Sequence, residues 1–168
     1  MSNIFNNFEE IISRMKLTPR KINIFNLLKL PAVFFTGIRV KSINDNECIV
    51  SVKYRWINQN PFRSMFWAVQ GMAAELTTGA LVLAKIRESG KQISMLVLNN
   101  NAAFSKKAIG RVSFMCQDGK LIDDAILKAI QTGEGQTVWM TSIGTNEKGI
   151  EVSTFNFEWT LKLKSKKT

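Results

Sequence analysis

The residue with the clearest chemical potential in this sequence is Glu75, a single carboxylate in the middle of the apolar stretch 66–86, FWAVQGMAAELTTGALVLAKI. A helix that is apolar on nearly every side must be buried on nearly every side, so we expect the rest of the chain to wrap around it. Burial disfavours the charged form of a carboxyl group and raises its pKa, which suits the group to proton transfer or to the activation of water. Glu75 is therefore the first candidate for a catalytic residue.

The absence of histidine limits the other chemistry that the chain can perform. It excludes Ser-His and Cys-His nucleophile pairs and His-ligated metal sites, which leaves carboxylate, Tyr, Lys and backbone groups. The two cysteines, Cys48 and Cys116, lie far apart in the sequence within alternating apolar runs, where a free thiol behaves as a small hydrophobic residue. We expect no disulfide, no metal and no cofactor.

Small residues accompany Glu75 along one side of the predicted helix. Gly71 and Gly79 lie four residues before and after it, and Ala68 and Val82 continue the same stripe. Residues four apart are neighbours on a helix surface, so we expect the carboxylate to lie in a groove with almost no side-chain walls. Such a groove admits either a closely packed second helix or a thin ligand such as an acyl chain, and both interpretations stay open.

The composition is that of a globular domain with a strong positive charge. The chain has 168 residues, which fits one domain, and 45% of them are hydrophobic and 21% charged. The formal net charge is +10, and four of the lysines lie in the last seven residues. The remaining positive charge suits a phosphate-bearing ligand, an acidic carrier protein or a nucleic acid.

The sequence favours a cytoplasmic location without a membrane span. The N-terminal residues lack the basic-then-apolar order of a secretory signal. The long apolar stretch contains Gln70, Glu75 and Thr77 near its centre, where a charge in a membrane would be expensive.

The periodicity of apolar residues predicts an α+β protein. We expect helices at 3–15, 18–28, 66–86 and 121–130, of which 66–86 is the central helix and 121–130 a short one. We expect strands at 33–44, 47–56, 94–106, 109–117, 136–144 and 150–163. The last strand alternates Phe155, Phe157 and Trp159 with polar residues, so its sheet has one packed face and one solvated face. The economical arrangement is one curved antiparallel sheet wrapped around the central helix.

This arrangement resembles the hotdog fold, and the segment around Glu75 resembles the thioesterase superfamily that uses it, particularly a poorly characterised branch with an N-terminal helical extension. Acyl-coenzyme A thioesterases of this superfamily carry a loop Asn, then His-Gly-Gly six residues later, then Asp or Glu nine residues after that His. Asn60, Phe66 and Glu75 have this spacing. Phe66, Trp67 and Ala68 occupy the three His-Gly-Gly positions.

A second element is also similar to the superfamily. The segment 103–108, AFSKKA, resembles its Phe-x-Lys-Pro-Ala strand element, with Lys107 in the proline position. The resemblance implies a hotdog domain at 31–164, a helical extension at 1–30 that packs on this domain, and a basic tail at 165–168.

The resemblance implies a mechanism for thioester hydrolysis. Glu75 would act as general base on water or as nucleophile, and Asn60 would orient the water or the carboxylate. The backbone N–H groups of Phe66, Trp67 and Ala68 would stabilise the oxyanion at the positive end of the helix dipole. The substrate would be an acyl thioester of coenzyme A or of an acyl carrier protein.

Other residues near these motifs are candidates for substrate binding. The candidates for lining an acyl groove are Gly71, Met72, Thr78 and Gly79. The candidates for binding the phosphates of coenzyme A are Arg63, Lys106, Lys107 and Arg111. The alternative for the first group is packing within the protein, and for the second a solvated charge. The superfamily places its sites at a subunit boundary, so we expect a homodimer, with pairing into a tetramer left open.

Two other functions are compatible with the sequence. A non-catalytic acyl- or lipid-binding protein with the same fold would explain the loss of the histidine and glycines while the groove remains. Nucleic-acid binding would use the positive surface, but the basic residues are not interleaved with exposed aromatic residues and no recognised motif is present. We therefore expect no nucleic-acid partner.

Overall fold

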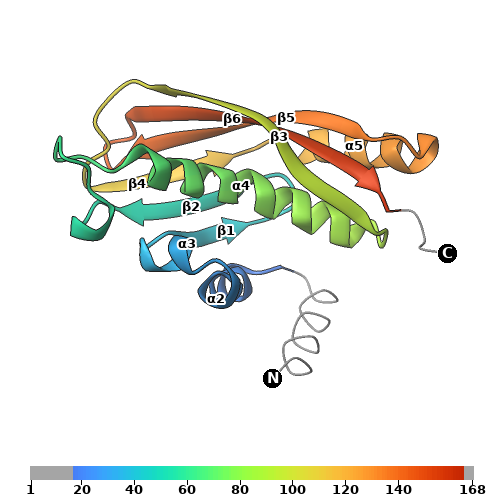
Figure 1. The fold of residues 1–168 in the computed structure, drawn as a ribbon, viewed down its shortest axis with the longest axis horizontal. Coiled ribbons are helices and arrows are strands. Elements are labelled where there is room, and N and C mark those ends of the chain that lie inside the picture. The colour runs from blue at the N-terminus through green and yellow to red at the C-terminus, as the bar shows by residue number, and fades with distance from the viewer. Residues whose placement is uncertain (1–16, 165–168) are drawn as a thin grey trace.

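Six antiparallel strands form one sheet, and the long helix α4 lies across it (Figure 1). The computed structural model describes residues 17–164, so the predicted helix at 3–15 and the basic tail at 165–168 lie outside the described residues. The elements are α2 (Pro19–Lys29), α3 (Pro31–Phe35), β1 (Arg39–Ile43), β2 (Cys48–Lys53), the 3-10 turn η1 (Trp56–Asn58), α4 (Trp67–Glu88), β3 (Ile93–Phe104), β4 (Arg111–Cys116), α5 (Gly119–Thr132), β5 (Gln136–Asn146) and β6 (Glu151–Leu163). The strand order is β1-β2-β4-β5-β6-β3, which leaves β1 and β3 at the edges.

The order of elements confirms the predicted α+β architecture, except that the prediction of a strand from residue 33 is wrong. Helix α3 occupies Pro31–Phe35 instead. Proline at the first helical position has a φ angle that suits a helix and lacks only an N–H that would have no helical acceptor. The N–H of Phe34 donates to the carbonyl of Leu30 at 3.1 Å, so a helical turn forms before β1 begins at Arg39.

Aromatic side chains of β6 form the surface on which α4 packs. Phe155, Phe157 and Trp159 are buried, as the alternation in this strand predicts. A Cβ atom added at Gly79 would lie 3.3 Å from the Trp159 ring, and Trp159 Nε1 donates to Thr78 Oγ1 at 3.0 Å. Small residues of α4 therefore permit a close approach between the helix and the sheet.

One side of α4 is not covered by the sheet. Met72 and Leu76 are half-buried and Glu75 is exposed, whereas the opposite side of the helix, including Leu81, is buried. The expectation that the chain encloses this helix on nearly every side is therefore wrong for this one side. The reason is that α4 contacts the sheet mainly with its opposite side, while residues of α2 and α3 and Met95 of β3 border the open one.

Asn23 fastens the N-terminal helices to the edge of the sheet. Its amide donates to the carbonyl of Val40 at 3.0 Å and accepts from the N–H of the same residue at 2.9 Å. At the start of α2, Thr18 Oγ1 accepts from the N–H of Lys21 at 3.4 Å, and Pro19 occupies the first turn, as predicted. These contacts hold α2 against β1, and Figure 1 shows α2 and α3 beside this edge strand.

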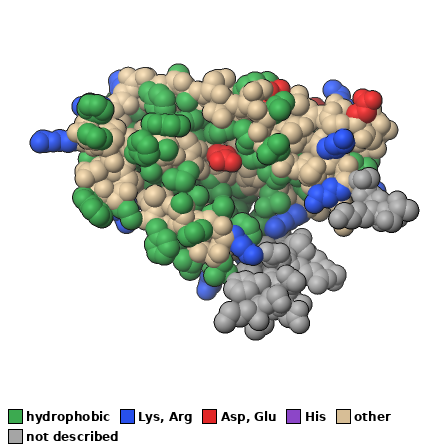
Figure 2. All heavy atoms as spheres, viewed as in Figure 1, with side chains coloured by type: hydrophobic (Ala, Val, Ile, Leu, Met, Phe, Trp, Pro, Cys, Tyr) green, Lys and Arg blue, Asp and Glu red, His purple; other side chains and the backbone are tan. Residues whose placement is uncertain are grey.

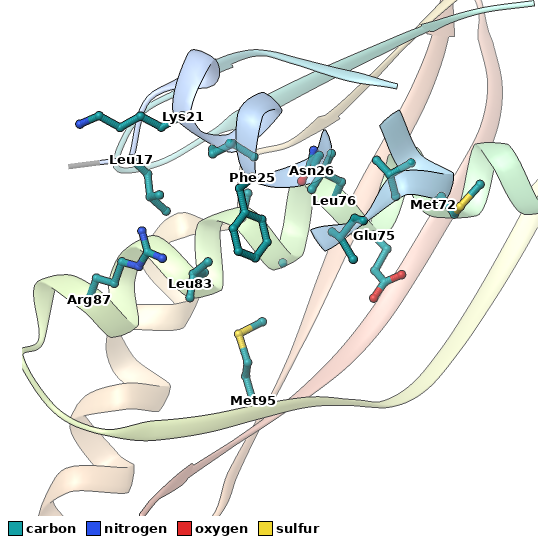
Figure 3. A pocket seen from close by; sticks show the side chains of 15 residues that line it. Leu17, Lys21, Phe25, Asn26, Met72, Glu75, Leu76, Leu83, Arg87 and Met95 are labelled. Carbon is teal, nitrogen blue, oxygen red and sulfur yellow. The ribbon is translucent and has the colours of Figure 1, made fainter. Parts of the chain in front are cut away.

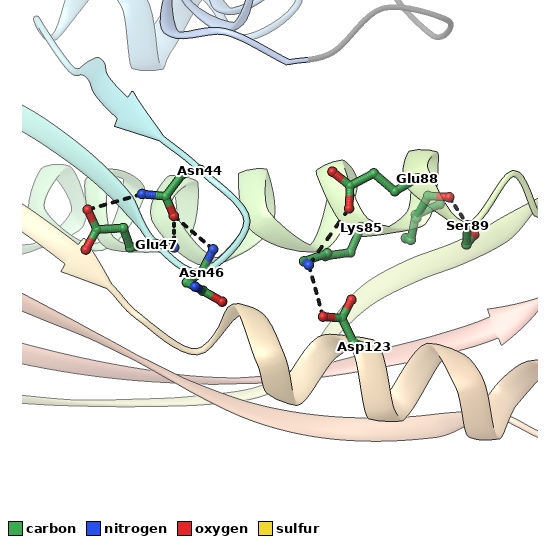
Figure 4. A network of polar contacts seen from close by, with 8 residues as sticks. Asn44, Asn46, Glu47, Lys85, Glu88, Ser89 and Asp123 are labelled. Atoms are coloured by element: carbon green, nitrogen blue, oxygen red, sulfur yellow. Dashed lines mark hydrogen bonds and ion pairs between the residues drawn. The ribbon is translucent and has the colours of Figure 1, made fainter.

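Polar contacts join the far end of α4 to α5 (Figure 4). Lys85 Nζ lies 2.9 Å from Asp123 Oδ2. In the nearby β1–β2 turn, Asn44 Oδ1 accepts from the N–H groups of Asn46 and Glu47, each at 2.9 Å.

The two cysteines are free thiols on facing positions of β2 and β4, and burial raises the pKa of each to about 12.

Candidate active site

Glu75 lines an apolar cavity between α4 and the N-terminal helices (Figure 3). The cavity has a volume of about 230 Å³. Aliphatic and aromatic side chains make up most of its lining, including Phe25 of α2, Leu76 and Leu83 of α4 and Met95 of β3. In Figure 3 the side chains of Glu75 and Leu83 project from α4, and Met95 projects toward the cavity from β3. The arrangement combines one acid with a surface suited to an alkyl chain.

The carboxyl group of Glu75 is isolated from other charges. No hydrogen bond or ion pair to its side chain occurs within residues 17–164. Although Glu75 is exposed, desolvation by its apolar surroundings raises its pKa above the usual value, in the predicted direction. A carboxylate with a raised pKa is a stronger base, which favours proton transfer from water.

The N-terminus of α4 offers two backbone donors. The N–H of Phe66, the residue before the helix, already donates to the carbonyl of Asn58 at 2.8 Å. The N–H groups of Trp67 and Ala68 have no acceptor in the described part of the chain. They lie at the positive end of the helix dipole and can therefore bind a negatively charged oxygen.

Asn60 shapes the loop that leads into α4. Its Oδ1 accepts from two backbone N–H groups of the loop, one of them that of Ser64 at 3.2 Å, and its Nδ2 donates to Ser64 Oγ at 3.0 Å. Asn60 also lines a second cavity, of about 400 Å³, together with Trp67, Lys106 and Lys107. This second cavity lies beside the N-terminus of α4 and has a basic rim.

The predicted catalytic groups do not meet within one chain. Glu75 and Asn60 line different cavities. Ala68 precedes Glu75 by seven residues of α4, which corresponds to about 10 Å along the helix axis. A base and an oxyanion donor that act on one carbonyl group must each lie within about 3–3.5 Å of the reacting atoms.

The predicted acyl-groove residues divide between the cavity and the sheet. Met72 and Gly79 line the cavity with Glu75. Thr78 is fully buried and hydrogen-bonded to the sheet, and a Cβ atom at Gly71 would lie 3.6 Å from a β6 ring. The structure therefore assigns Gly71 and Thr78 to packing between helix and sheet.

The four predicted phosphate-binding side chains are all exposed. Lys106 and Lys107 line the second cavity, and Lys107 Nζ donates to the carbonyl of Phe62 at 3.2 Å. Arg63 has a left-handed backbone with φ 57° in the loop, and neither Arg63 nor Arg111 lines either cavity. Of the four, Lys106 and Lys107 thus line the cavity beside the N-terminus of α4.

A comparison with protein families finds one family that matches most of the chain. Residues 20–161 match a domain of unknown function, DUF4442. The chain belongs to the DUF4442 family. A comparison of its sequence with curated proteins finds no match.

Solved structures share the fold of this DUF4442 protein at low sequence identity. A Pseudomonas aeruginosa protein of unknown function, described as a "Probable Thioesterase", is 20% identical with a TM-score of 0.76, and the match covers 90% of this chain and 99% of that one. A protein of unknown function from Chlorobaculum tepidum is 17% identical with a TM-score of 0.75, over 89% and 99% of the two chains. A thioesterase from Haemophilus influenzae is 15% identical with a TM-score of 0.64, over 89% and 94%. These similarities confirm the predicted hotdog fold.

Three buried amides of the DUF4442 domain are not identified by the sequence analysis. Asn58 supports the loop before α4, and Gln70 bridges the carbonyl of Met65 and the hydroxyl of Ser153 at 3.3 and 3.0 Å. Asn26 lines the cavity of Glu75 and is buried. A polar residue within an apolar stretch is the only sequence signal that marks these positions, and it does not reveal a partner.

The described part of the DUF4442 chain offers acid, amide and backbone groups for chemistry. Residues 17–164 contain no group of three or more His, Cys, Asp or Glu side chains placed to hold a metal ion. In the same residues, no helix has the length and apolar character needed to cross a membrane.

Proposed function

We propose that the protein hydrolyses an acyl thioester with Glu75 as the general base. The observation that carries this proposal is an unpaired carboxylate of raised pKa in the lining of an apolar cavity. Such a cavity suits an acyl chain, and a base at its surface suits attack on the carbonyl group at the end of that chain. The shared fold of the Haemophilus influenzae thioesterase supports the same class of reaction.

In the proposed reaction, the Glu75 carboxylate takes a proton from a water molecule as the water oxygen attacks the thioester carbonyl carbon. The tetrahedral intermediate carries a negative oxygen, which accepts hydrogen bonds from the N–H groups of Trp67 and Ala68. The C–S bond then breaks, and the leaving thiolate takes the proton from Glu75. The products are a carboxylic acid and a thiol.

The separation of these groups along α4 requires two copies of the chain. Glu75 lies about 10 Å along the helix from Ala68, so one copy cannot supply both groups to one carbonyl. Two copies of α4 packed antiparallel by their open sides would bring the N-terminus of one beside the Glu75 of the other. We therefore infer a homodimer with two equivalent sites.

The surface around the open side of α4 supports this dimer. Phe66 and Trp67 at the start of α4 are 44% and 59% exposed, and Met72, Leu76 and Met95 are only partly buried. Figure 2 shows hydrophobic side chains gathered over this face, with an acidic side chain among them. Strand β3 is a twelve-residue edge strand that pairs only with β6 in the described chain, and long exposed edges favour pairing with another strand. A second copy would cover the apolar face and the strand edge together.

The second cavity suits the carrier part of the substrate. Lys106 and Lys107 place positive charge beside the N-terminus of α4. Their charge favours either the phosphates of coenzyme A or the acidic surface of an acyl carrier protein. Asn60 lies in the same cavity and would help to orient the thioester or the attacking water.

Hydrolysis assays with a panel of acyl-coenzyme A and acyl-carrier-protein substrates test the proposal. We expect turnover by the wild type and a loss of at least about 100-fold in kcat for Glu75→Gln, because general-base catalysis contributes about 10²–10⁴-fold. Glu88→Gln, on the exposed end of the same helix, is the matched control and should retain the wild-type rate. Full activity in Glu75→Gln would overturn the assignment of the base.

A non-catalytic acyl-binding protein is the second candidate. The observation that favours it is the engaged N–H of Phe66, which leaves only Trp67 and Ala68 of the three predicted oxyanion donors. In that case acyl thioesters bind without turnover, and Glu75→Gln binds them as tightly as the wild type does. Calorimetry run beside the hydrolysis assay separates the two candidates.

A further inference from the structure

Helix α2 carries apolar side chains on two opposite sides, and only one of these sides is covered. On the inner side Ile22 is buried, and Figure 3 shows the ring of Phe25 pointing from α2 toward α4 at the cavity of Glu75. Three residues on the other side, Ile24, Leu27 and Leu28, are between 42% and 46% exposed. Residues three and four apart are neighbours on a helix, so these three form one continuous stripe, which we call the α2 stripe.

The α2 stripe is bordered by basic side chains. Arg20 precedes Ile24 by four residues and therefore lies on the same side of the helix, and Lys29 follows Leu28 at the end of the helix. Both basic residues are exposed, as is Phe35 of the adjoining helix α3. Single exposed apolar residues are common on proteins, whereas a contiguous apolar group with a polar border marks an interaction surface.

The charge of this region indicates the kind of partner. The segment 17–44, which contains α2, α3 and β1, has five basic residues and no acidic one. A second copy of the chain would bring the same positive charge against itself, which disfavours self-association through the α2 stripe. An anionic lipid bilayer fits both features of the surface, because its headgroups attract Lys and Arg while its acyl region accepts Leu and Ile.

Helix α5 provides a contrast within the same chain. Its Leu121 and Leu127 are exposed to a degree similar to that of the α2 stripe. Two lysines on α5 are balanced by Asp123 and Asp124, so this helix has no excess of positive charge. Exposed leucines and a net positive charge therefore occur together on α2 and not on α5, and α5 supplies matched control positions.

We infer that the protein docks on the surface of an anionic lipid bilayer through the α2 stripe, with its apolar side chains in the bilayer interface and Arg20 and Lys29 at the headgroups. In this position α2 lies between the bilayer and the cavity of Glu75, because Ile22 and Phe25 line that cavity from the same helix. The bilayer then comes within about 10 Å of the cavity, one helix diameter. Such docking goes beyond the proposed function and applies equally to a protein that binds acyl chains without turnover.

Sedimentation with lipid vesicles tests the docking of the full-length protein. Vesicles of phosphatidylcholine alone are compared with vesicles of phosphatidylcholine and phosphatidylglycerol in equal amounts, each at several salt concentrations. We expect the wild type to bind the anionic vesicles at least about tenfold more tightly than the neutral ones, because several basic residues meet the headgroups. This binding should weaken as the salt concentration rises, since salt screens the attraction.

Replacement of leucines separates the α2 stripe from other apolar surface. Leu27→Gln/Leu28→Gln removes apolar area that the bilayer would cover, so it should bind anionic vesicles at least about tenfold more weakly than the wild type. Leu121→Gln/Leu127→Gln replaces two leucines of similar exposure on α5 and should bind as the wild type does. Circular dichroism checks that both variants are folded.

Replacement of basic residues tests the electrostatic part of the docking and does not depend on the leucine variants. Arg20→Gln/Lys29→Gln should weaken binding to anionic vesicles at least about tenfold and reduce its dependence on salt. Lys120→Gln/Lys128→Gln removes the same net charge from α5. This control should weaken binding by less than about twofold at physiological salt, because charges far from the docked surface are screened.

Several outcomes would overturn the docking. Wild-type protein that binds neither kind of vesicle, or binds both equally, would do so, and so would equal losses in the α2 and α5 variants. Binding to an acidic acyl carrier protein that requires the α2 stripe, without binding to vesicles, would assign the surface to a protein partner instead.

These outcomes are separate from those of the proposed function. Hydrolysis of soluble acyl-coenzyme A by a protein that binds no vesicles would reject the docking alone. Vesicle binding that requires the α2 stripe, in a protein that hydrolyses no thioester, would reject the enzymatic proposal alone.

Discussion

The side-chain amide of Asn58 donates a hydrogen bond to the carbonyl oxygen of Thr36 at 3.0 Å, which joins the end of α3 to the loop before α4. The same Nδ2 donates to the carbonyl of Lys53 at 2.9 Å, and Oδ1 accepts from the N–H of Arg55 at 2.8 Å. Asn58 is 1% exposed, and its backbone carbonyl accepts from the N–H of Phe66. One buried residue therefore sets the position at which the central helix begins.

Replacement of Asn58 by alanine should destabilise the fold strongly. Asn58→Ala removes three hydrogen bonds and leaves partly buried backbone groups without these partners, so we expect a loss of about 2–4 kcal/mol in the free energy of unfolding. Urea denaturation measures this loss. Asn60→Ala, in the more exposed part of the same loop, is the control and should lose less than half as much. Equal losses in the two variants would contradict the central role given to Asn58.

The rate of thioester hydrolysis should depend on pH through Glu75. The carboxyl group must be ionised to accept a proton from water, and desolvation raises its pKa. We therefore expect kcat/KM to fall with decreasing pH, with a midpoint above the usual glutamate value of about 4.3. A pH–rate profile of the wild type and of Glu88→Gln should give the same midpoint. A midpoint at or below about 4.3 would argue that the attacking base is another group.

The raised pKa of Glu75 also predicts how the stability of the fold changes with pH. The folded state holds the proton more tightly than the unfolded state, so ionisation of Glu75 lowers stability as the pH rises through the folded-state pKa. Glu75→Gln should therefore unfold at a higher temperature than the wild type at neutral pH. The difference should disappear below a pH of about 4.3, where both states are protonated. If Glu75→Gln and the wild type differ in unfolding temperature by the same amount at both pH values, the change in stability comes from packing and not from ionisation of Glu75.

Gly119 should not tolerate a larger residue. A Cβ atom at this first residue of α5 would overlap the carbonyl oxygen of Asp45 and the backbone of Asn46 in the β1–β2 turn. Because backbone atoms cannot yield easily, we expect Gly119→Ala to lose about 1–3 kcal/mol of stability.

Gly71→Ala is the matched control for this change. Its Cβ atom would make an ordinary contact of 3.6 Å with Phe155 of β6. Gly71 lies inside α4, where alanine has a higher helix propensity than glycine. The control should be neutral or stabilising in the same denaturation experiment. A tolerated Gly119→Ala would show that the turn can move away from α5.

Regular periodicity explains which elements the sequence predicts. The strands β2 and β4–β6 and the helix α4 follow from apolar residues at intervals of two and from one long apolar stretch. The helix α3 is missed because the alternation from Val33 onward resembles a strand, whereas Pro31 starts a helix. The partners of Asn58 lie as far as Thr36 in the sequence, so only the tertiary structure can reveal them.

The candidate site is predicted only in part, and the open side of α4 explains why. A helix that is apolar on every side has the same sequence whether its own chain or a second chain covers it. Glu75 and Gly79 of the predicted stripe line one cavity together with Met72, whereas Gly71 of the same stripe packs against β6. Asn60 and the helix N-terminus belong to a different cavity, because the 1.5 Å rise per residue separates groups that the sequence places in one motif.

The two edges of the sheet differ in whether they can accept another strand. At β1, the amide of Asn23 occupies the N–H and the carbonyl of Val40, much as the backbone of a neighbouring strand would. At β3, the outer edge carries no such blocking group in the described chain. Molecules that can join through only one edge form a closed pair and cannot extend into a filament. By occupying both backbone groups of Val40, Asn23 therefore disfavours polymerisation through β1 and leaves β3 as the edge open to a partner strand.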